Sequence, residues 1–336
     1  MDSAGKVALI TGCTSGIGLG LAEKLVKEHR HLHICLSGRN EEKLKSVLSV
    51  LKLKYPNSNL SMLVLDVSDS KSVLNAVREI RNRFNRLDFI FLNAGMMPET
   101  RINWMNVVKG LFNGKIIHMF LTGDGMLEAL PEKKTRDGLS LTFATNVFGH
   151  FVLVSELQDI LGRTAAGDYT HLIWTSSSSA NSLNCFDKSD VMCLNGKQSY
   201  ASSKYCMDAL SISLNENWNS KGIYSSVVCP GVVWSSMTGA LLPAWVWYLM
   251  MPLFFLLRVF IRNLTLTLDA ATSGLVWLTH QQPESLDYHQ KIYTRASWFG
   301  SYLDFHKIKV EEETKNDIWK QMSQLRSRIT QRLKNV

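Results

Sequence analysis

The stretch Lys6-Val-Ala-Leu-Ile-Thr-Gly-Cys-Thr-Ser-Gly-Ile-Gly18 decides the fold of this chain. It opens with an apolar run at residues 7–10, of the kind that forms a strand buried on both faces of a parallel sheet. A glycine-rich turn follows, and apolar residues then recur at helical spacing through Leu21 and Leu25. Glycines let the backbone approach a ligand closely, and the start of a helix attracts negative charge, so this order predicts a phosphate-binding site. We assign to that site Thr11, Gly12, Ser15, Gly16, Ile17 and Gly18.

The alternation of apolar strands and amphipathic helices continues along the chain. Five further runs read as strands, at residues 32–36, 60–65, 87–92, 171–177 and 224–228. Such alternation predicts an α/β fold, a doubly wound parallel sheet of the Rossmann type with helices on both faces. We assign residues 1–285 to this domain, with a folded insertion at 97–136 that packs near the active site or forms a partner surface. Residues 286–336 read as a C-terminal extension ending in an amphipathic helix at 311–334.

Small or polar residues follow the predicted strands, at the edge where parallel sheets bind their ligands. Arg39 follows the second strand where an acidic residue would favour NAD, so NADP(H) with its 2′-phosphate is expected; a plain surface charge is the alternative. Asp66-Val67 follows the third strand, and its carboxylate either accepts from an adenine amino group or caps the next helix. Asn93-Ala94-Gly95 follows the fourth strand and Pro230-Gly231 the sixth, where small residues admit a dinucleotide close to the backbone.

Tyr200 and Lys204 lie four residues apart, and therefore on one face of a predicted helix. An ammonium beside a phenol lowers the pKa of the phenol, so Tyr200 is expected to exchange a proton with a carbonyl or an alcohol near neutral pH. The serine run 176–179 ends the fifth strand at the same edge of the sheet, and the pattern leaves open which serine is chemical. A long helix predicted at 138–161 carries Asn146, which holds a water, bends the helix or makes a simple polar packing contact.

Composition narrows the classes of function. The 336 residues are 46% hydrophobic and 20% charged, enough for one large α/β domain or two smaller ones. The net charge of +8 suits a phosphorylated cofactor or an anionic membrane face, while the lack of a basic run with interleaved aromatic residues argues against nucleic acid. The six cysteines are scattered without CxxC or metal-ligand spacing, so we expect reduced thiols facing the cytosol and no metal site.

An apolar stretch at residues 240–257 contains no charged residue. It is borderline in length for a membrane span, which takes about twenty apolar residues, and Pro243 and Pro252 interrupt it. We therefore expect residues 236–262 to form a hydrophobic substrate lid that dips into the membrane interface, with Arg258 and Arg262 at headgroup level. An ordinary buried pair of helices is the alternative.

Taken together, these motifs resemble the short-chain dehydrogenase/reductase family over about residues 5 to 285. The resemblance rests on the order of the glycine-rich turn, Asn93-Ala94-Gly95, Asn146, the strand-end serines, Tyr200-x-x-x-Lys204 and Pro230-Gly231. The words Leu92-Asn-Ala-Gly-Met-Met-Pro98 and Leu172-Ile-Trp-Thr-Ser-Ser177 are similar to the 3-keto-steroid reductases of sterol biosynthesis. The resemblance implies an NADPH-dependent enzyme that reduces a sterol 3-ketone to the 3β-alcohol during removal of the C4 methyl groups. In vertebrate members it also implies reduction of estrone.

The same resemblance implies roles for single residues. Tyr200 would be the general acid, Lys204 would lower its pKa and bind the nicotinamide ribose, and Asn146 would hold a water for proton resupply. Ser177 would orient the carbonyl, although an insertion between Ser179 and Ser199 departs from the commoner spacing. Either Ser235 or Ser236 would hold the nicotinamide amide.

A sterol substrate places the enzyme at the cytosolic face of the endoplasmic reticulum membrane, with other enzymes of sterol C4-demethylation as candidate partners. Two alternatives remain from the sequence: a reductase of another lipophilic carbonyl, such as retinal or a long-chain ketone, and a cofactor-binding scaffold in a sterol-processing complex. The presence of Tyr200, Lys204 and Asn146 argues against the scaffold, which needs none of them.

Overall fold

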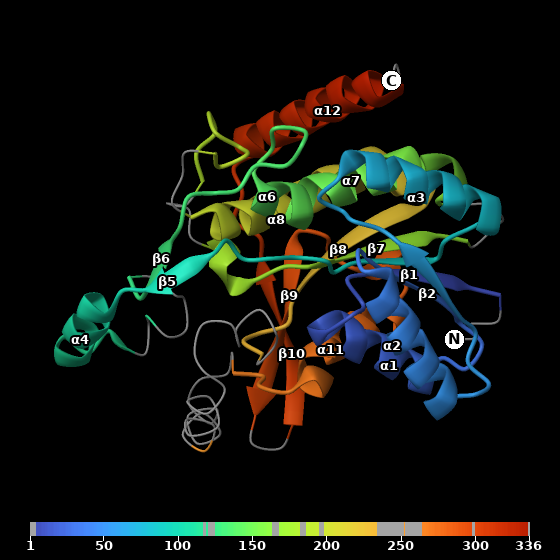
Figure 1. Cartoon of the computed structure of the whole chain (residues 1–336), viewed down its shortest axis with the longest axis horizontal. Helices are drawn as coiled ribbons and strands as arrows, with labels where there is room; N and C mark the ends of the chain where they lie inside the picture. Colours follow the sequence, from blue (N-terminus) through green and yellow to red (C-terminus); the bar gives the residue numbers. More distant parts are fainter. Residues whose placement is uncertain are drawn as a thin grey trace.

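One eight-stranded sheet runs through the molecule (Figure 1). The computed structural model describes residues 5–116, 119, 125–162, 168–181, 186–194, 198–233, 252, 264–297 and 300–334. In spatial order the strands are β10 (Gly300–Lys307), β9 (Gln290–Ser297), β8 (Ile223–Cys229), β7 (Thr170–Thr175), β4 (Phe89–Leu92), β1 (Val7–Thr11), β2 (His33–Gly38) and β3 (Leu60–Val64). All neighbouring pairs are parallel except β9 and β10, which run antiparallel. The predicted doubly wound sheet and all six predicted strands are confirmed.

Helices cover both faces of this sheet because side chains along each strand alternate between two apolar cores. Leu9, Ile90 and Leu172 face one core, and Ile10, Phe91 and Ile173 face the other. The first core is covered by α3 (Ser70–Arg83), α7 (Gly149–Glu156) and α8 (Ser199–Trp218), with α12 (Glu312–Lys334) lying outside them (Figure 1). The second is covered by α1 (Gly16–Glu28), α2 (Glu41–Lys54) and α11 (Leu268–Trp277).

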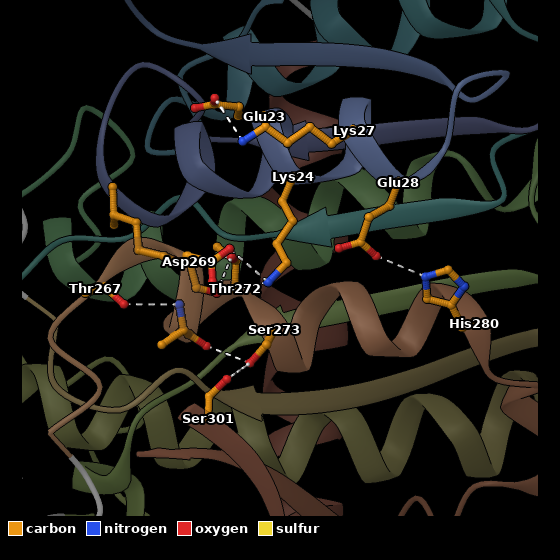
Figure 2. A network of polar contacts seen from close by, with 12 residues as sticks. Glu23, Lys24, Lys27, Glu28, Thr267, Asp269, Thr272, Ser273, His280 and Ser301 are labelled. Atoms are coloured by element: carbon orange, nitrogen blue, oxygen red, sulfur yellow. Dashed lines mark hydrogen bonds and ion pairs between the residues drawn. The ribbon is translucent and has the colours of Figure 1, made fainter. Parts of the chain in front are cut away.

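Polar contacts tie α11 to α1, the helix that follows the glycine-rich turn (Figure 2). The Lys24 ammonium lies 3.2 Å from the Asp269 carboxylate and donates to the Asp269 carbonyl at 3.1 Å. At the other end of the pair, His280 lies 3.2 Å from Glu28. The chain that returns after residue 263 is thus fixed directly to the predicted phosphate-binding helix.

The structure extends the sheet beyond the boundary predicted at residue 285. β9 pairs with β8, and β10 closes the sheet as its edge strand, so residues 290–307 belong to the main sheet rather than to an extension. Only the last part of the predicted extension is helical, and its final helix, α12, is confirmed. α12 buries an apolar stripe that includes Ile318, Met322 and Leu325.

The single helix predicted at 138–161 is wrong in detail. A short α6 (Leu141–Phe143) leads into a π-helical turn at Ala144–Phe148, and α7 follows. The turn widens where Gly149 lies against another strand end: a Cβ on Gly149 would sit 1.7 Å from the Val67 carbonyl oxygen. Only a glycine lets the helix pass this close, and the π-helical turn ends directly before it, at Phe148.

The insertion at 97–136 forms an arm on the domain. β5 (Thr100–Ile102) pairs antiparallel with β6 (Leu127–Ala129), and α4 (Trp104–Phe112) lies at the far end of this two-stranded sheet (Figure 1). Apart from Pro252, the predicted lid at 236–262 lies outside the described residues. Across the part of the chain that the structure describes, none of the helices combines the length and apolarity needed to cross a bilayer.

Candidate active site

The site lies where β8, β7, β4 and β1 end, four neighbouring strands in the middle of the sheet. Their carboxyl ends deliver Pro230, Ser176, Asn93 and Gly12 to one edge. Strand order reverses at this point, since β4 and β2 flank β1 on opposite sides. Crevices of this kind, at the reversal point of an open parallel sheet, are where such folds bind their ligands.

The glycine-rich turn has the close backbone packing that its sequence predicts. Gly12 adopts a φ of +74°, and a Cβ there would lie 2.9 Å from the Ala94 Cα. A Cβ on Gly18 would lie 2.2 Å from the Gly12 carbonyl oxygen. The first turn of α1 carries no acidic side chain, so the helix presents its positive end without an internal counter-charge. These residues fit the pyrophosphate of a dinucleotide.

Thr11 joins this turn to the next strand end. Its hydroxyl oxygen accepts from the amides of Asn93 and Ala94, each at 2.9 Å, and Asn93 returns a hydrogen bond to the Thr11 carbonyl at 3.0 Å. The hydroxyl proton faces the Phe91 carbonyl at 3.2 Å and His150 Nε2 at 3.0 Å. These hydrogen bonds join the end of β1 to the end of β4.

His150 is a site residue that the sequence reasoning missed. The ring is fully buried, and burial lowers the pKa of His150 to about 3, so it is neutral at physiological pH. Its Nδ1 lies 3.3 Å from the Asn146 carbonyl, which can only accept, so Nδ1 carries the proton and Nε2 accepts from Thr11. His150 thus connects the cofactor turn to the π-helical turn. In the sequence, His150 follows Asn146 by four residues, which places it one helical turn further along the same face.

Asn146 is buried in the π-helical turn, and its side chain hydrogen-bonds the backbone of Met96. Its side-chain oxygen accepts from the Met96 amide at 2.8 Å, and its amide donates to the Met96 carbonyl at 3.0 Å and to Ser203 at 2.9 Å. Gly95 lies close beside it: a Cβ there would be 3.3 Å from the Asn146 oxygen, a tight contact, and 3.8 Å from Lys204 Nζ. Of the roles weighed for Asn146, the polar packing contact is the one that these hydrogen bonds show, and its role in bending the helix stays a prediction. Its water-holding role stays a prediction.

Tyr200 and Ser177 meet at the mouth of the site. Burial raises the pKa of Tyr200 to about 12, and the nearby Ser177 hydroxyl, which donates to the Ser179 hydroxyl at 3.1 Å, opposes this rise. The expected lowering of the Tyr200 pKa by Lys204 is wrong for this structure. The Lys204 ammonium donates to the Thr175 carbonyl at 2.7 Å and lies 5.6 Å from the centre of the Tyr200 ring. A phenol with this pKa is protonated at neutral pH, as a proton donor to a ketone must be.

Lys204 itself is buried, and its environment disfavours the charged form. Burial, and next the nearby Lys291 ammonium, lower the pKa of Lys204 to about 8. Its charge is therefore retained at neutral pH but is lost in mildly alkaline solution.

Beneath the site lies a buried ion pair that the sequence reasoning also missed. Lys291 on β9 and Asp208 on α8 meet at 2.7 Å, with side chains only 2% and 4% exposed. The Lys291 ammonium also donates to the Ser177 carbonyl at 2.6 Å, and the Ser176 hydroxyl donates to Asp208 at 2.6 Å. The two adjacent serines therefore differ in their contacts. The Ser176 hydroxyl bonds the buried Asp208, whereas the Ser177 hydroxyl lies near Tyr200.

Arg39 and Asp66 are the residues predicted to bind the adenosine half of the cofactor. Arg39 is exposed directly after β2, beside the glycine-rich turn, where a Cβ on Gly38 would lie 3.2 Å from the Thr14 methyl group. Asp66 accepts from the amide and hydroxyl of Ser68, at 2.9 and 2.7 Å. It does not cap the next helix, because Asp69 is the N-cap of α3. The contacts of Arg39 with a 2′-phosphate and of Asp66 with adenine stay predictions.

At the nicotinamide end, Gly231 adopts a φ of +78° and the Pro230 carbonyl accepts from the Thr265 hydroxyl at 2.9 Å. Thr265 also donates to the Val232 carbonyl at 3.1 Å, which joins the chain on either side of residues 234–263. Ser235 and Ser236, expected to hold the nicotinamide amide, lie outside the described residues.

Comparisons with known proteins agree with this geometry. A model of the short chain dehydrogenase family matches residues 6–244. The 3-keto-steroid reductase/17-beta-hydroxysteroid dehydrogenase 7 of Homo sapiens is 42% identical to this chain, covering 96% of it and 94% of the relative. A 3-keto-steroid reductase of Saccharomyces cerevisiae is 27% identical and covers 76% of this chain and 74% of its own length.

Among solved structures, a short chain dehydrogenase from Burkholderia cenocepacia, crystallised in complex with NADP, superposes with a TM-score of 0.59. It is 19% identical and covers 86% of this chain and 96% of that chain. A likeness at this level of identity speaks for the shared fold alone.

Proposed function

The chain belongs to the short-chain dehydrogenase family, and from this premise we propose that it reduces a sterol 3-ketone to the 3β-alcohol with NADPH. The observation that carries the proposal is the similarity to the human 3-keto-steroid reductase over 96% of the chain. A likeness restricted to the cofactor-binding strands would support reduction of any carbonyl. This one continues through the residues after β8, where the substrate end of such a site lies.

The residues of the site divide the work of ketone reduction. Bound NADPH supplies the hydride. Tyr200, whose pKa of about 12 keeps it protonated, donates its proton to the carbonyl oxygen, and the Ser177 hydroxyl stabilises the charge that develops there. The Lys204 ammonium adds positive charge on the inner side of the site at neutral pH. The α1 N-terminus and Arg39 bind the cofactor phosphates.

A second candidate substrate has its own support. The human relative is named for a 17-beta-hydroxysteroid dehydrogenase activity as well as for 3-keto-steroid reduction. Reduction of a steroid 17-ketone such as estrone uses the same proton donor and hydride source, so it requires only that the substrate bind in the reverse direction.

The decisive experiment is NADPH oxidation by the purified protein with detergent-solubilised ketones: 4-methyl sterol 3-ketones, estrone, retinal and long-chain ketones. We expect the highest kcat/KM with the sterol 3-ketones, and turnover lowered by roughly three or more orders of magnitude in Tyr200→Phe. A preference for retinal or a long-chain ketone would replace the sterol by another lipophilic carbonyl. NADPH binding without oxidation by any of these ketones would favour a cofactor-binding scaffold.

We also propose that the enzyme acts at the cytosolic face of the endoplasmic reticulum membrane, beside other enzymes of sterol C4-demethylation. Sterol ketones partition into bilayers, and the apolar residues 240–257 suit a segment that lies in the interface. The full chain should sediment with microsomes, and protease added outside should reach tags on both termini. A protected C-terminal tag with an exposed N-terminus would indicate a genuine span and exclude the interfacial lid.

A further inference from the structure

The apolar face of α4 points outward. In this nine-residue helix, Trp104, Val108 and Leu111 fall at positions i, i+4 and i+7, and Met105 and Phe112 fall next to them. All five side chains are exposed, Trp104 by 64% and Phe112 by 88%. Soluble proteins rarely leave such a continuous apolar face in water unless it binds something.

The opposite face of α4 is the one that packs on the arm. Gly110 is buried, and a Cβ there would lie 2.4 Å from the Met119 sulfur. Asn106 on the same side donates to the Gly125 carbonyl at 3.0 Å. A helix with small and polar residues inward and aromatic residues outward is reversed relative to ordinary surface helices. The sequence of α4 therefore favours packing through Gly110 and Asn106, which leaves its apolar face outward.

The charge around this face favours a lipid surface over a protein surface. Between Arg101 and Ile116 the sequence holds three cations and no acidic residue. Arg101 pairs with Glu128 at 3.0 Å, while Lys109 lies exposed at the edge of the apolar face and Lys115 just beyond the helix. Tryptophan and phenylalanine with lysines at their margin are the composition that inserts into the boundary between lipid headgroups and acyl chains.

The arm starts inside the active site. Its first residue after Gly95 is Met96, whose amide and carbonyl are both held by the Asn146 side chain, and β5 begins shortly after it. Figure 1 shows α4 at the far end of this arm, away from the helices that cover the sheet. A surface bound by α4 is thus connected to the catalytic residues through one short, anchored stretch of chain.

We propose that the outward face of α4, formed by Trp104, Met105, Val108, Leu111 and Phe112, docks the enzyme onto an anionic phospholipid bilayer. Docking there sets the mouth of the site against the bilayer from which a lipophilic ketone enters. Entry of a ketone from the bilayer into the site rests on the proposed function, whereas lipid binding by α4 does not.

The test is flotation of the full chain with vesicles of phosphatidylcholine containing phosphatidylserine, in the absence of ketone and NADPH. We expect Trp104→Ser/Phe112→Ser to lower the vesicle partition coefficient by roughly tenfold or more, since two large apolar side chains leave the lipid. Lys109→Glu should lower it less, and added salt should remove that difference. Val50→Ser/Leu53→Ser, which changes two exposed apolar residues of α2, is the matched control and should bind like wild type.

Separate measurements on the α4 variant, Trp104→Ser/Phe112→Ser, report on its folding and on its function. NADPH affinity, thermal unfolding and turnover of a small water-soluble ketone should not change in the α4 variant, while the KM for a vesicle-borne sterol ketone should rise. Vesicle binding by the α4 variant equal to that of wild type overturns the proposal. A wild-type dimer in light scattering that the α4 variant dissociates, without vesicle binding by either, overturns it in favour of a second copy. If vesicle binding is lost as expected but no sterol ketone is reduced by wild type, the docking surface stands and the proposed function fails.

Discussion

Replacing Lys291 by methionine tests whether the ion pair beneath the site is needed for stability and for the charge of Lys204. The Lys291 ammonium bonds Asp208 at 2.7 Å and the Ser177 carbonyl at 2.6 Å, with both side chains almost fully buried. Methionine keeps most of the side-chain volume but leaves the Asp208 carboxylate with Ser176 as its remaining described partner in this cluster. Removing one member of a buried pair costs about 3–5 kcal/mol, because the other charge stays desolvated.

The comparison should be made at neutral pH, where the contribution is fully present. Burial is the largest single influence and lowers the pKa of Lys291, but the Asp208 carboxylate, together with the Cys229 and Tyr293 side chains, raises the pKa above its ordinary value. A raised lysine pKa stabilises the fold below the ordinary lysine pKa, and this stabilisation is lost only as the pH rises through the raised value. Urea unfolding at pH 7 therefore measures the whole contribution.

A double-mutant cycle separates the pair from the packing. Lys291→Met and Asp208→Asn should each be costly, and the double variant should be more stable than their sum predicts by at least about 2 kcal/mol. Free energies of unfolding that add to within about 0.5 kcal/mol would show that the two residues are not coupled, and the reasoning would be refuted.

Lys291→Met should also change the pH dependence of NADPH binding, which a purely structural role of Lys291 would leave unchanged. Lys291 is the second cause, after burial, of the lowered pKa of Lys204. Without that ammonium the pKa of Lys204 should rise above about 8, so the alkaline loss of NADPH affinity should move to higher pH. Fluorescence titration of NADPH between pH 6 and 10 reports this limb, and Lys204→Met, which should lack it, is the control.

Three further substitutions test single site residues. Tyr200→Phe should keep NADPH affinity and lose reduction by roughly three or more orders of magnitude in single turnovers, because only the proton donor is removed; a tenth of wild-type turnover would contradict its role. Arg39→Asp should shift the ratio of kcat/KM values from NADPH toward NADH, and an unchanged ratio would mean that another residue reads the 2′-phosphate. Ser177→Ala should lower kcat with little change in unfolding, whereas Ser176→Ala should cost about 1–3 kcal/mol of stability by unbinding Asp208; the reverse outcome would exchange the two serines.

Much of the fold could be predicted because its signals are local. Continuous apolar runs mark strands buried on both faces, and each of the six predicted from them is present. β9 was missed because its sequence, Gln290 to Ser297, places Lys291 and Arg295 among its apolar residues. These cations are neutralised by carboxylates outside the strand, Asp208 for Lys291 and Asp304 on the adjacent β10 for Arg295. A strand whose charges are neutralised by residues outside it has no apolar run to identify it.

The candidate site divides in the same way. The glycine-rich turn and the Tyr200–Lys204 spacing are local patterns, and the sequence predicts both. His150 bonds Thr11 across 139 positions, and Lys291 bonds Asp208 across 83, so neither pairing leaves a trace in any short stretch. The direction of the Tyr200 pKa failed for a related reason: helical spacing puts Lys204 on the right face, but the Thr175 carbonyl on β7 takes its ammonium.

The arm shows where apolar periodicity alone reaches its limit. The apolar residues at 97–136 predict a folded insertion and no more, and the helical spacing of those in α4 is the same whether their face points into a core or into lipid. The information that separates the two lies on the other face, where Gly110 and Asn106 allow close packing on Met119 and Gly125. A helix that buries an apolar stripe in its own domain has no need for a glycine opposite it, because that side faces water and tolerates any polar residue. In α4, by contrast, a small residue lies opposite the apolar stripe, and the helix carries a lysine and no acidic residue. This combination indicates a helix that packs through its polar side and presents its apolar side to a bilayer.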